Sequence, residues 1–441
     1  MPLNSLDLAR ARWFGSDSPK HIRFSAHGSS VVTCLLFFHN RIISASDDHS
    51  IHIYSPFTGE LIHSLEGHEG GVWALAASQD TLVSGSTDRT VRIWDLKNGR
   101  CTHVFGGHTS TVRCLAIVKP EMVDMPVVGG KEGETKKERW PKRPLIVTGS
   151  RDHSLRVWKL PKPSEPEYKA DNGDPDAGDN PYHCLHLSDH DHAVRALAAR
   201  GRTLVSGSYD CTVRIWDIIT GEQKWVLVGH TQKVYSVLLD VSRKQACSGS
   251  MDGIVRIWSL TTGTCLHTLT GHTSLVGLLG LSPSYLVSAA ADSTLRIWDP
   301  STGELKHTLT HTGAITCFQH DEYKVLSGSD GNLKMWNVED GTLVRDLLTG
   351  ITGVWQVVFE GRWCVAASNR NDSTVLDVWD FGREEDEGWT EGSSSGVDSD
   401  EDGNDENTGD GEVRAQEIER EEKHVVQDDQ PIPKGFVNIA L

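Results

Sequence analysis

The sequence predicts an all-β fold, a closed propeller of eight four-stranded blades, and three observations lead to this prediction. A short string with an aromatic residue near its end recurs eight times along the 441 residues. Most of the spacings between these strings match the length of one propeller blade. The segments between them alternate apolar and polar residues over short runs bounded by Gly, Asp, Ser and Thr, which is typical of strands joined by turns.

The recurring strings are IHIYS, VRIWD, LRVWK, VRIWD, VRIWS, LRIWD, LKMWN and LDVWD, and their aromatic residues are Tyr54, Trp94, Trp158, Trp216, Trp258, Trp298, Trp336 and Trp379. Five of the seven spacings lie between 38 and 43 residues, and one blade takes roughly 40 to 45. The other two, 64 and 58 residues, flank Trp158. They predict insertions at about 119–144 and 161–181 in an otherwise regular propeller.

A polar set recurs at fixed offsets within the blades, and the second blade carries it as His68, Ser84, Asp88 and Trp94. The carboxylate can accept from the imidazole, the imidazole can bond the hydroxyl, and the indole N–H can close the network. We therefore interpret these histidines as structural, without a metal or catalytic role. Four more blades carry the set, as His108, Thr148, Asp152, Trp158; His190, Ser206, Asp210, Trp216; His230, Ser248, Asp252, Trp258; and His272, Ser288, Asp292, Trp298.

The two ends of the chain differ from the repeats. Residues 1–20 are a lead-in, and HIRFS (21–25) is a strand that we expect to complete the eighth blade, so that the propeller spans 21–382 and leaves no open sheet edge. Residues 383–430 hold 19 Asp and Glu against 4 Lys and Arg, so this segment carries 15 of the 18 net negative charges. Its composition predicts a disordered acidic tail over 383–441.

The nine cysteines are single, without a CxxC pair, which favours reduced thiols and no zinc site. No run approaches the 18 or so apolar residues of a membrane span. The basic string KKERWPKR (136–143) is consistent with nuclear import, or equally with a solvated loop. We expect a location in the nucleus and cytoplasm, with no membrane partner.

Residues that differ between similar blades are candidates for function. Arginines in the third strands recur at one register and are interpreted as solvated scaffold residues. The position five residues after the structural His, at the start of each first strand, instead reads Val32, Trp73, Arg113, Arg195, Tyr235, Gly277, Thr316 and Trp355. Two arginines are thus neighbours in the ring, with aromatic residues on both sides.

Adjacent strands of an antiparallel blade run in opposite directions, so the loop before the first strand and the turn between the second and third strands open on one face. The turns place Arg151 in the blade of Arg113 and Tyr209 in the blade of Arg195, and Arg89 lies in the turn of the second blade. Ser110 and Thr111 add hydroxyls to the same mouth. The two insertions follow first and third strands, so we expect them on the opposite face.

Three guanidinium groups that face one mouth repel one another unless something offsets the repulsion. Rim carboxylates are one explanation. A bound oxyanion is the other, because a phosphate offers several acceptor oxygens to forked donors. Trp73, Tyr235 and Trp355 would then give flat apolar surfaces to residues beside the phosphate, proline among them.

Several strings of the predicted propeller are close to a known pattern: GHEGGVW (67–73), SGSTDRTVRIWD (84–95), GHTSTVRCL (107–115), SGSRD, VRAL, SGSYD, GHTQKVYS and HTLTGHTSL (267–275). Over roughly residues 20–382 the chain resembles the WD-repeat domains of F-box substrate receptors in SCF ubiquitin ligases, of the cell-division-control-four type. The resemblance implies a propeller that binds phosphodegrons, in which phosphoserine or phosphothreonine precedes proline.

The resemblance also implies roles for individual residues. It assigns phosphate binding to Arg113, Arg151 and Arg195 and the packing of apolar peptide residues to Trp73 and Trp355. The pocket lining would be Ser110, Thr111, Tyr209, Tyr235 and Arg89. Receptors of this family carry an F-box ahead of the propeller, and the residues before the first repeat are too few to hold one. We therefore expect docking to an SCF ligase adaptor only if a longer chain carries an F-box.

The sequence observations predict a non-enzymatic recognition module, and the resemblance implies that it is the phosphodegron-binding part of an SCF-type ubiquitin ligase that directs phosphorylated proteins to degradation. The alternative is a WD-repeat scaffold for protein complexes without ligase docking. A nucleic-acid partner is disfavoured because the cations cluster at one mouth and form no long basic stripe. An enzyme is disfavoured because no nucleophile paired with a general base, and no metal-ligand spacing, stands apart from the repeat. No cofactor is expected.

Overall fold

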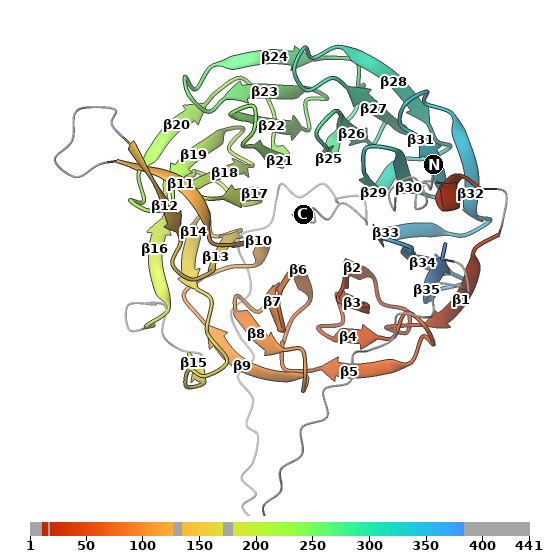
Figure 1. Cartoon of the computed structure of the whole chain (residues 1–441), viewed down its shortest axis with the longest axis horizontal. Coiled ribbons are helices and arrows are strands. Elements are labelled where there is room, and N and C mark those ends of the chain that lie inside the picture. Colours follow the sequence, from red (N-terminus) through yellow and green to blue (C-terminus); the bar gives the residue numbers. More distant parts are fainter. Residues whose placement is uncertain (1–10, 16–17, 127–134, 171–179, 383–441) are drawn as a thin grey trace, which may run out of the picture. The chain divides into compact units, whose positions relative to one another are not determined.

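The computed structural model describes residues 11–15, 18–126, 135–170 and 180–382, and its strands confirm the prediction of eight blades in a ring (Figure 1). In each blade the first strand lies nearest the centre of the ring and the fourth lies at the rim. Blade 1 is β2 (Val32–Phe38), β3 (Arg41–Ser46), β4 (Ile51–Tyr54) and β5 (Leu61–Leu65); blade 2 is β6 (Val72–Ser78), β7 (Thr81–Ser86), β8 (Val91–Asp95) and β9 (Arg100–Phe105). Blade 3 is β10 (Val112–Val118), β13 (Leu145–Ser150), β14 (Leu155–Lys159) and β16 (His183–Leu187); blade 4 is β17 (Val194–Arg200), β18 (Thr203–Ser208), β19 (Val213–Asp217) and β20 (Gln223–Leu227).

The second half of the ring repeats the same antiparallel order. Blade 5 is β21 (Val234–Asp240), β22 (Gln245–Ser250), β23 (Val255–Ser259) and β24 (Cys265–Leu269); blade 6 is β25 (Val276–Leu281), β26 (Leu286–Ala290), β27 (Thr294–Trp298) and β28 (Leu305–Thr310). Blade 7 is β29 (Ile315–His320), β30 (Lys324–Ser329), β31 (Asn332–Asn337) and β32 (Leu343–Thr349); blade 8 is β33 (Gly353–Glu360), β34 (Trp363–Arg370), β35 (Ser373–Asp380) and β1 (Lys20–Ser25).

Blade 8 closes the ring with strands from both ends of the propeller. Strand β1 pairs antiparallel with β35, from Lys20 opposite Asp380 to Ser25 opposite Val375. The fully buried carboxylate of Asp377 accepts hydrogen bonds from Arg23 Nε (2.8 Å) on β1 and from Arg370 Nη2 (3.1 Å) on β34. The outermost strand is thereby held by an ion cluster as well as by its backbone ladder.

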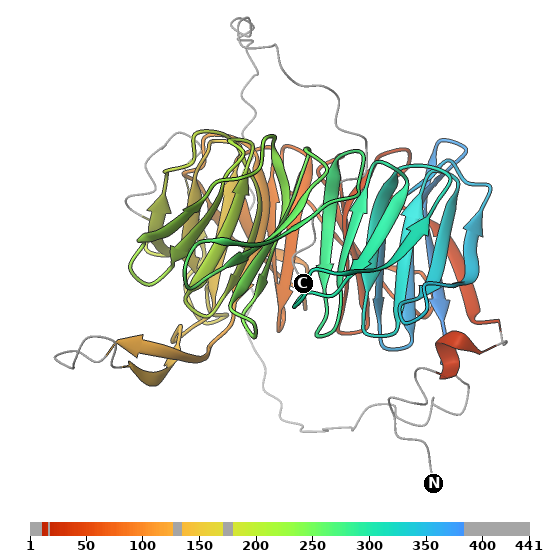
Figure 2. The ribbon, with the colours of Figure 1, turned by 90° about the horizontal axis from the view of Figure 1, so that it is seen from above.

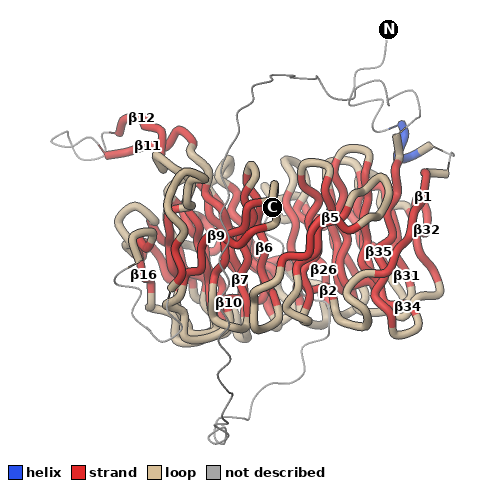
Figure 3. The backbone as a smooth tube through the Cα atoms, turned by 90° about the horizontal axis from the view of Figure 1, so that it is seen from below, coloured by secondary structure: helices blue, strands red, loops and turns tan. Residues whose placement is uncertain are grey.

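The two insertions behave differently. Residues from the first form the hairpin β11 (Glu121–Pro126) and β12 (Thr135–Trp140), which lies on one face of the ring in both side views (Figures 2 and 3). Strand β10 runs from Arg113 near its start to this hairpin, so the hairpin lies on the face away from the predicted mouth. The second insertion carries β15 (Tyr168–Lys169), which pairs in parallel with β9 and adds a fifth strand to the rim of blade 2. The second insertion therefore also covers a blade edge, which the strand-direction argument does not predict.

A single helical turn, 11–14, docks on the same face as the hairpin (Figure 2). Trp13 is buried, its ring stacks on Phe381 with centroids 3.9 Å apart, and its indole N–H donates to the carbonyl of Gly361 at 3.0 Å. Part of the predicted lead-in is therefore packed against blade 8. The predicted acidic tail over 383–441 lies outside the described residues.

The predicted polar networks are confirmed in blades 2 to 6. In each, the His Nδ1 lies 2.6–3.0 Å from the Asp carboxylate and the His Nε2 lies 2.7–2.8 Å from the Ser or Thr hydroxyl. The Trp indole donates to the same hydroxyl at 2.8–3.0 Å. Burial lowers the pKa of His68, which favours the neutral imidazole that such a network needs. Blade 7 keeps the arrangement with Asn332 in the place of the Asp.

The interpretation of the third-strand arginines as solvated is wrong for Arg156 and Arg214, which are buried, whereas Arg92, Arg256 and Arg296 are half-buried. The guanidinium carbon of Arg156 lies 5.9 Å from the ring centroid of Trp158, and Arg256 lies 5.8 Å from that of Trp258. Their aliphatic stems and cationic heads pack over the repeat tryptophans, which is a scaffold role of another kind.

The core lies between the blades and not inside a single sheet. One cluster joins Val83 and Ile93 of blade 2 to Val112, Ile146 and Trp158 of blade 3. Neighbouring blades cover the faces of each sheet, so the middle strands are mostly buried and their polar side chains join the networks described above. In the described ranges no helix is long and apolar enough to cross a membrane. No group of three His, Cys, Asp or Glu side chains among those residues could hold a metal ion.

Candidate functional site

All eight first strands carry a β-bulge at the same register, and this bulge places the candidate site residues. The pairing with the second strand skips one residue in every blade, and the skipped residues are Thr33, Trp73, Arg113, Arg195, Tyr235, Gly277, Thr316 and Trp355. A bulge leaves its extra residue outside the ladder and redirects the side chain. The candidate positions are therefore structurally equivalent, because each is the bulge residue of a first strand that lines the central channel of the ring.

Blade 1 corrects the register that was counted from the sequence. Val32 pairs with Ser46, as Val72 pairs with Ser86 in blade 2, and the bulge residue is Thr33. The loop before this strand holds one more residue between the structural His and the bulge than the loop of blade 2 does. A fixed offset of five therefore fails in this blade alone among those that keep the His.

The two bulge arginines are each held against an aromatic ring. The guanidinium carbon of Arg113 lies 4.2 Å from the ring centroid of Trp73 in blade 2. That of Arg195, whose side chain is buried, lies 5.7 Å from the ring centroid of Tyr235 in blade 5. Cation–π contacts of this kind stabilise a cation without neutralising its charge. The arginines therefore keep their charge while losing much of their freedom to move.

The turn residues join the bulge residues at the mouth. The backbone N–H of Arg151 donates to the carbonyl of Thr111 at 2.9 Å, and the hydroxyl of Ser150 donates to the carbonyl of Ser110 at 3.0 Å. Between blades 4 and 5 the ring centroids of Tyr209 and Tyr235 are 5.3 Å apart. Both predicted loops of blade 3 therefore meet at one mouth, with the tyrosines beside Arg195.

Electrostatics show that the three arginines are close enough to influence one another. Burial is the largest cause that lowers the pKa of Arg113, to about 10, and repulsion from Arg195 and Arg151 lowers it further. The group is still protonated at neutral pH. The repeat carboxylates of the same blades, Asp152 and Asp210, bond the structural histidines at 2.8 and 2.7 Å.

Two of the predicted site residues, Arg89 and Trp355, lie outside the group formed around the arginines. Arg89 is exposed, in a turn with φ of 71°. Trp355 is buried in blade 8, packed with Val32 and Tyr54, and is separated from Trp73 by the whole of blade 1. The structure thus brings together Trp73, Arg113, Arg151, Arg195, Tyr209 and Tyr235, with Ser110 and Thr111 on the loop beside Arg151, and leaves Arg89 and Trp355 on the edges.

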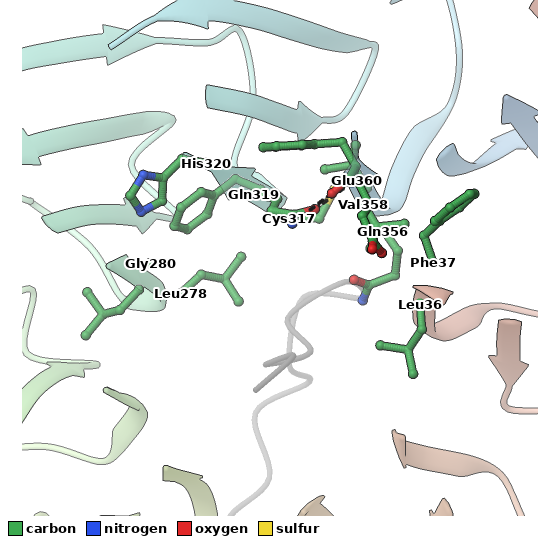
Figure 4. A pocket seen from close by; sticks show the side chains of 14 residues that line it. Leu36, Phe37, Leu278, Gly280, Cys317, Gln319, His320, Gln356, Val358 and Glu360 are labelled. Carbon is green, nitrogen blue, oxygen red and sulfur yellow. Dashed lines mark hydrogen bonds between the residues drawn. The ribbon is translucent and has the colours of Figure 1, made fainter. Parts of the chain in front are cut away.

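The first strands also line an apolar cavity of about 260 Å³ away from the mouth, which the sequence analysis does not predict (Figure 4). Leu36 and Phe37 come from blade 1, Leu278 from blade 6, Phe318 from blade 7 and Val358 from blade 8. Such residues are ordinary for buried strands, so only the ring closure reveals that they face one space. The two ends of the channel therefore differ in chemistry, cationic at the mouth and apolar at the opposite end.

Sequence reasoning also missed three basic side chains beside the arginines, His153, His192 and Lys233. The rings of His153 and His192 are stacked with centroids 5.6 Å apart, and Lys233 Nζ lies 4.9 Å from the ring centroid of Tyr209. A signal was present, since the DHDH string (189–192) holds two histidines and only His190 fills the structural position. His192 therefore has no part in the repeat network.

Comparison with known proteins gives matches along most of the propeller. The family described as WD domain, G-beta repeat matches seven segments: residues 18–55, 59–95, 140–159, 182–217, 221–259, 263–299 and 303–337. The first segment contains β1, so the repeat in the sequence begins with the outermost strand of the preceding blade.

Two fungal relatives match over a similar range. Cell division control protein 4 of Candida albicans is 47% identical over 379 residues, which cover 84% of this chain and 54% of that protein. WD repeat-containing protein pop2 of Schizosaccharomyces pombe is 45% identical over 379 residues, 85% of this chain and 53% of that protein. The chain spans about half the length of these curated relatives. A crystal structure of the computationally designed Ika8 protein, 27% identical, superposes with a TM-score of 0.64 and covers 81% of this chain and 98% of its own.

Proposed function

Because the chain belongs to the family of WD-repeat propellers, which are non-catalytic interaction modules, we propose that its mouth binds phosphorylated Ser/Thr-Pro segments of other proteins. The observation that carries the proposal is the convergence of Arg113, Arg151 and Arg195 at one mouth. Arg195 and Arg151 both lower the pKa of Arg113 by repulsion, and the guanidinium groups of Arg113 and Arg195 lie against aromatic rings.

The geometry suits a phosphate better than a single carboxylate. Guanidinium groups offer forked N–H donors, and a phosphate presents several acceptor oxygens at once. Charge-assisted hydrogen bonds contribute about 1.5–3 kcal/mol each. The mutual repulsion that lowers the pKa of Arg113 is relieved when a dianion lies between the three groups. The rings of Trp73, Tyr209 and Tyr235 then border the space beside the phosphate, where a proline ring can pack.

The relatives support a role for this binding in protein degradation. The chain resembles F-box substrate receptors, and cell division control protein 4 of Candida albicans is 47% identical to it over 379 residues. We propose that the propeller is the substrate-recognition part of an SCF-type ubiquitin ligase acting in the nucleus and cytoplasm. Docking to the ligase adaptor is part of this proposal only for a chain that also carries an F-box.

The experiment is binding of a fluorescent Ser/Thr-Pro peptide, phosphorylated and unphosphorylated, measured by anisotropy. We expect tight binding of the phosphorylated form alone, and a loss of about ten-fold or more in affinity for each of Arg113→Ala, Arg151→Ala and Arg195→Ala, because one charged bond is worth about 1.5 kcal/mol or more. Arg139→Ala is the matched control, since it removes the same charge from the exposed hairpin on the opposite face.

Two outcomes would contradict the proposal. Equal binding of both peptides would show that the arginines do not read a phosphate. Intact binding by the three arginine variants would favour the second candidate, a scaffold whose partner docks elsewhere on the ring.

A further inference from the structure

The end of the channel opposite the mouth holds two adjoining cavities. One, of about 260 Å³, is lined by first strands of blades 1, 6, 7 and 8, and the other, of about 400 Å³, by residues of blades 1 to 6. They meet at Leu36 and Phe37 of blade 1 and at Leu279 and Gly280 of blade 6, which line both. We call these two spaces together the far-end cavity. A cavity of about 150 Å³ already holds a benzene ring, so the far-end cavity has room for several apolar side chains.

The far-end cavity is apolar but contains a buried hydrogen-bond acceptor. Gln356 on β33 is 2% exposed, and its Nε2 donates to the carbonyl of Thr33 in blade 1 at 3.0 Å. Among the described residues no group donates to its Oε1, and the carboxamide lies in the cavity beside Leu36 (Figure 4). Gln319 of blade 7 differs, because its carboxamide exchanges two hydrogen bonds with the backbone of Phe359, at 2.6 and 3.2 Å. A buried acceptor without a donor is costly, so Gln356 favours a ligand that brings an N–H group.

The chain leaves blade 8 beside this cavity. The backbone N–H of Phe381 donates to the carbonyl of Arg362 at 2.8 Å, and Arg362 follows two residues after Glu360, which lines the cavity. Trp13 stacks on Phe381 and also meets the ring of Phe359, another lining residue, with centroids 5.7 Å apart. The chain therefore leaves the described propeller at the blade 8 wall of the far-end cavity, on the face opposite the mouth.

One part of the sequence beyond this point has the chemistry that the cavity requires. Residues 383–430 are strongly acidic, whereas residues 431–441, PIPKGFVNIAL, hold no acidic residue and a single Lys. Five of the six residues of 436–441 are apolar, and we call 436–441 the apolar run. Pro431 and Pro433 favour an extended backbone ahead of it. Burying the apolar run removes apolar surface from water, and its backbone N–H groups are donors for Gln356.

The intervening residues are long enough for the apolar run to reach the cavity. Residues 382 and 436 are 54 positions apart, and a flexible chain of that length spans about 40 Å on average. The first strand β2, which runs from the mouth to the cavity, has seven residues and is only about 24 Å long. A tether of this reach keeps the apolar run near the cavity at an effective concentration of about 0.1–1 mM.

We propose that the apolar run binds in the far-end cavity of its own chain. Its side chains pack against Leu36, Phe37 and Val358, and one of its backbone N–H groups donates to Oε1 of Gln356. The bound run contacts first strands of blades 6, 7, 8 and 1, so it braces the ring where strands from both ends of the propeller close it. The site is separate from the mouth, and the inference does not depend on phosphate binding there.

Photocrosslinking in the full chain tests the occupant directly. Phe436→p-benzoylphenylalanine places a photoreactive group in the apolar run, and Trp389→p-benzoylphenylalanine places it in the acidic stretch as a matched control. We expect crosslinks within one chain from position 436 to cavity residues, read by mass spectrometry and enriched at least ten-fold over those from position 389. Crosslinks that join two chains would identify a second copy as the occupant and contradict the proposal. An equal spread of crosslinks from both positions would contradict it too.

A competition experiment measures how fully the apolar run occupies the cavity. The probe is a fluorescein-labelled peptide of residues 431–441, titrated by anisotropy with the full chain and with its Phe436→Ser, Ile439→Ser double variant. We expect the double variant to bind the probe with a Kd of about 10 µM and the wild-type chain to bind it about 10- to 100-fold more weakly, because the tethered run competes at about 0.1–1 mM. Equal affinities, or no binding by the double variant up to about 1 mM, would overturn the proposal.

One further substitution locates the bound probe. Added to the double variant, Leu36→Arg places a cation in the cavity and should weaken probe binding ten-fold or more. Leu61→Arg, in the exposed outer strand of the same blade, should leave binding unchanged. Thermal unfolding checks that both variants are folded, and if Leu36→Arg is not, the crosslinks from position 436 decide the question in a chain with an unaltered cavity. Undiminished binding by a folded Leu36→Arg variant would mean that the apolar run binds elsewhere.

Discussion

The bulge residues at the mouth differ between two sets of blades: those of blades 3 and 4, which we call the cationic arc, and those of blades 1 and 7, which we call the threonine arc. In blades 3 and 4 the bulge residues are Arg113 and Arg195, which lie against aromatic rings and bring charge to the mouth. In blades 1 and 7 they are Thr33 and Thr316, whose hydroxyls donate to the second strand of their own blade at 3.1 and 3.2 Å. The same hydroxyls also contact the carbonyl of Val72 or Val354 in the next blade.

The comparison separates position from chemistry. The bulge places every one of these residues at the same point of its blade, whatever the side chain is. A small hydroxylated residue there joins two blades, whereas a long cationic one lies against an aromatic ring. Under the proposed function, binding depends on which side chain stands at a position that the fold supplies eight times.

The largest expected effect comes from making the cationic arc resemble the threonine arc. The double substitution Arg113→Thr with Arg195→Thr should weaken phosphopeptide binding by about 100-fold or more, since two charged bonds of about 1.5 kcal/mol or more are lost. Titration calorimetry measures the affinity, and circular dichroism checks the fold. A loss below ten-fold would mean that the cationic arc is not where the phosphate binds.

Acid should weaken the scaffold beneath both arcs. Burial lowers the pKa of His311 to about 4, against about 6.5 in an unfolded chain. Since the folded pKa is the lower one, this stability is complete above pH 6.5 and is lost as the pH falls toward 4. By pH 5 the loss from His311 is about 2 kcal/mol. For Asp252, burial raises the pKa, but hydrogen bonds outweigh it and hold the pKa at about 2. Because this value is below the roughly 3.9 of an unfolded chain, the stability that Asp252 contributes to the folded state is lost only below about pH 4.

Urea unfolding at pH 7.5, 6 and 5 measures this loss. His311→Gln should make the decline in unfolding free energy shallower, because the substituted side chain does not titrate. An unfolding free energy that stays constant from pH 7.5 to 5 would contradict the neutral, buried state assigned to these histidines.

A smaller effect should follow from removing the aromatic support of one arginine. Trp73→Leu keeps an apolar side chain but loses the contact with Arg113, worth about 0.5–2 kcal/mol. We expect phosphopeptide affinity to fall by about two- to thirty-fold with little change for a peptide that lacks the phosphate. Equal losses for both peptides would mean that the support of Arg113 by Trp73 adds nothing to phosphate binding beyond any direct packing of Trp73 on the peptide.

The smallest effect concerns the threonine arc. Thr33→Val and Thr316→Val keep the shape and remove the buried hydroxyl, which should cost about 1 kcal/mol of stability and leave phosphopeptide affinity within about two-fold. Chemical denaturation and the anisotropy assay measure the two quantities. A large loss of affinity would show that the two arcs share the ligand and that the comparison between them fails.

Much of this organisation was predictable because repeats make registers comparable. The structural networks of blades 2 to 6 and the adjacency of Arg113 and Arg195 follow from offsets within each unit. The offset failed for Thr33, because a longer loop shifts the strand while the bulge keeps its place. Two of the third-strand arginines, Arg156 and Arg214, were misread because the alternation in a strand does not tell whether a face meets solvent or the next blade.

The sequence by itself determined the number of blades, the structural polar networks and the arginines that occupy the mouth, because these depend on patterns within about forty residues. Only the tertiary structure decided which groups meet across blades. The stacking of His153 on His192, the support of Arg113 by Trp73 and the apolar cavity at the far end of the channel each join side chains from different blades. Such contacts depend on how each blade packs against its neighbours in the ring, which no pattern within a single repeat describes.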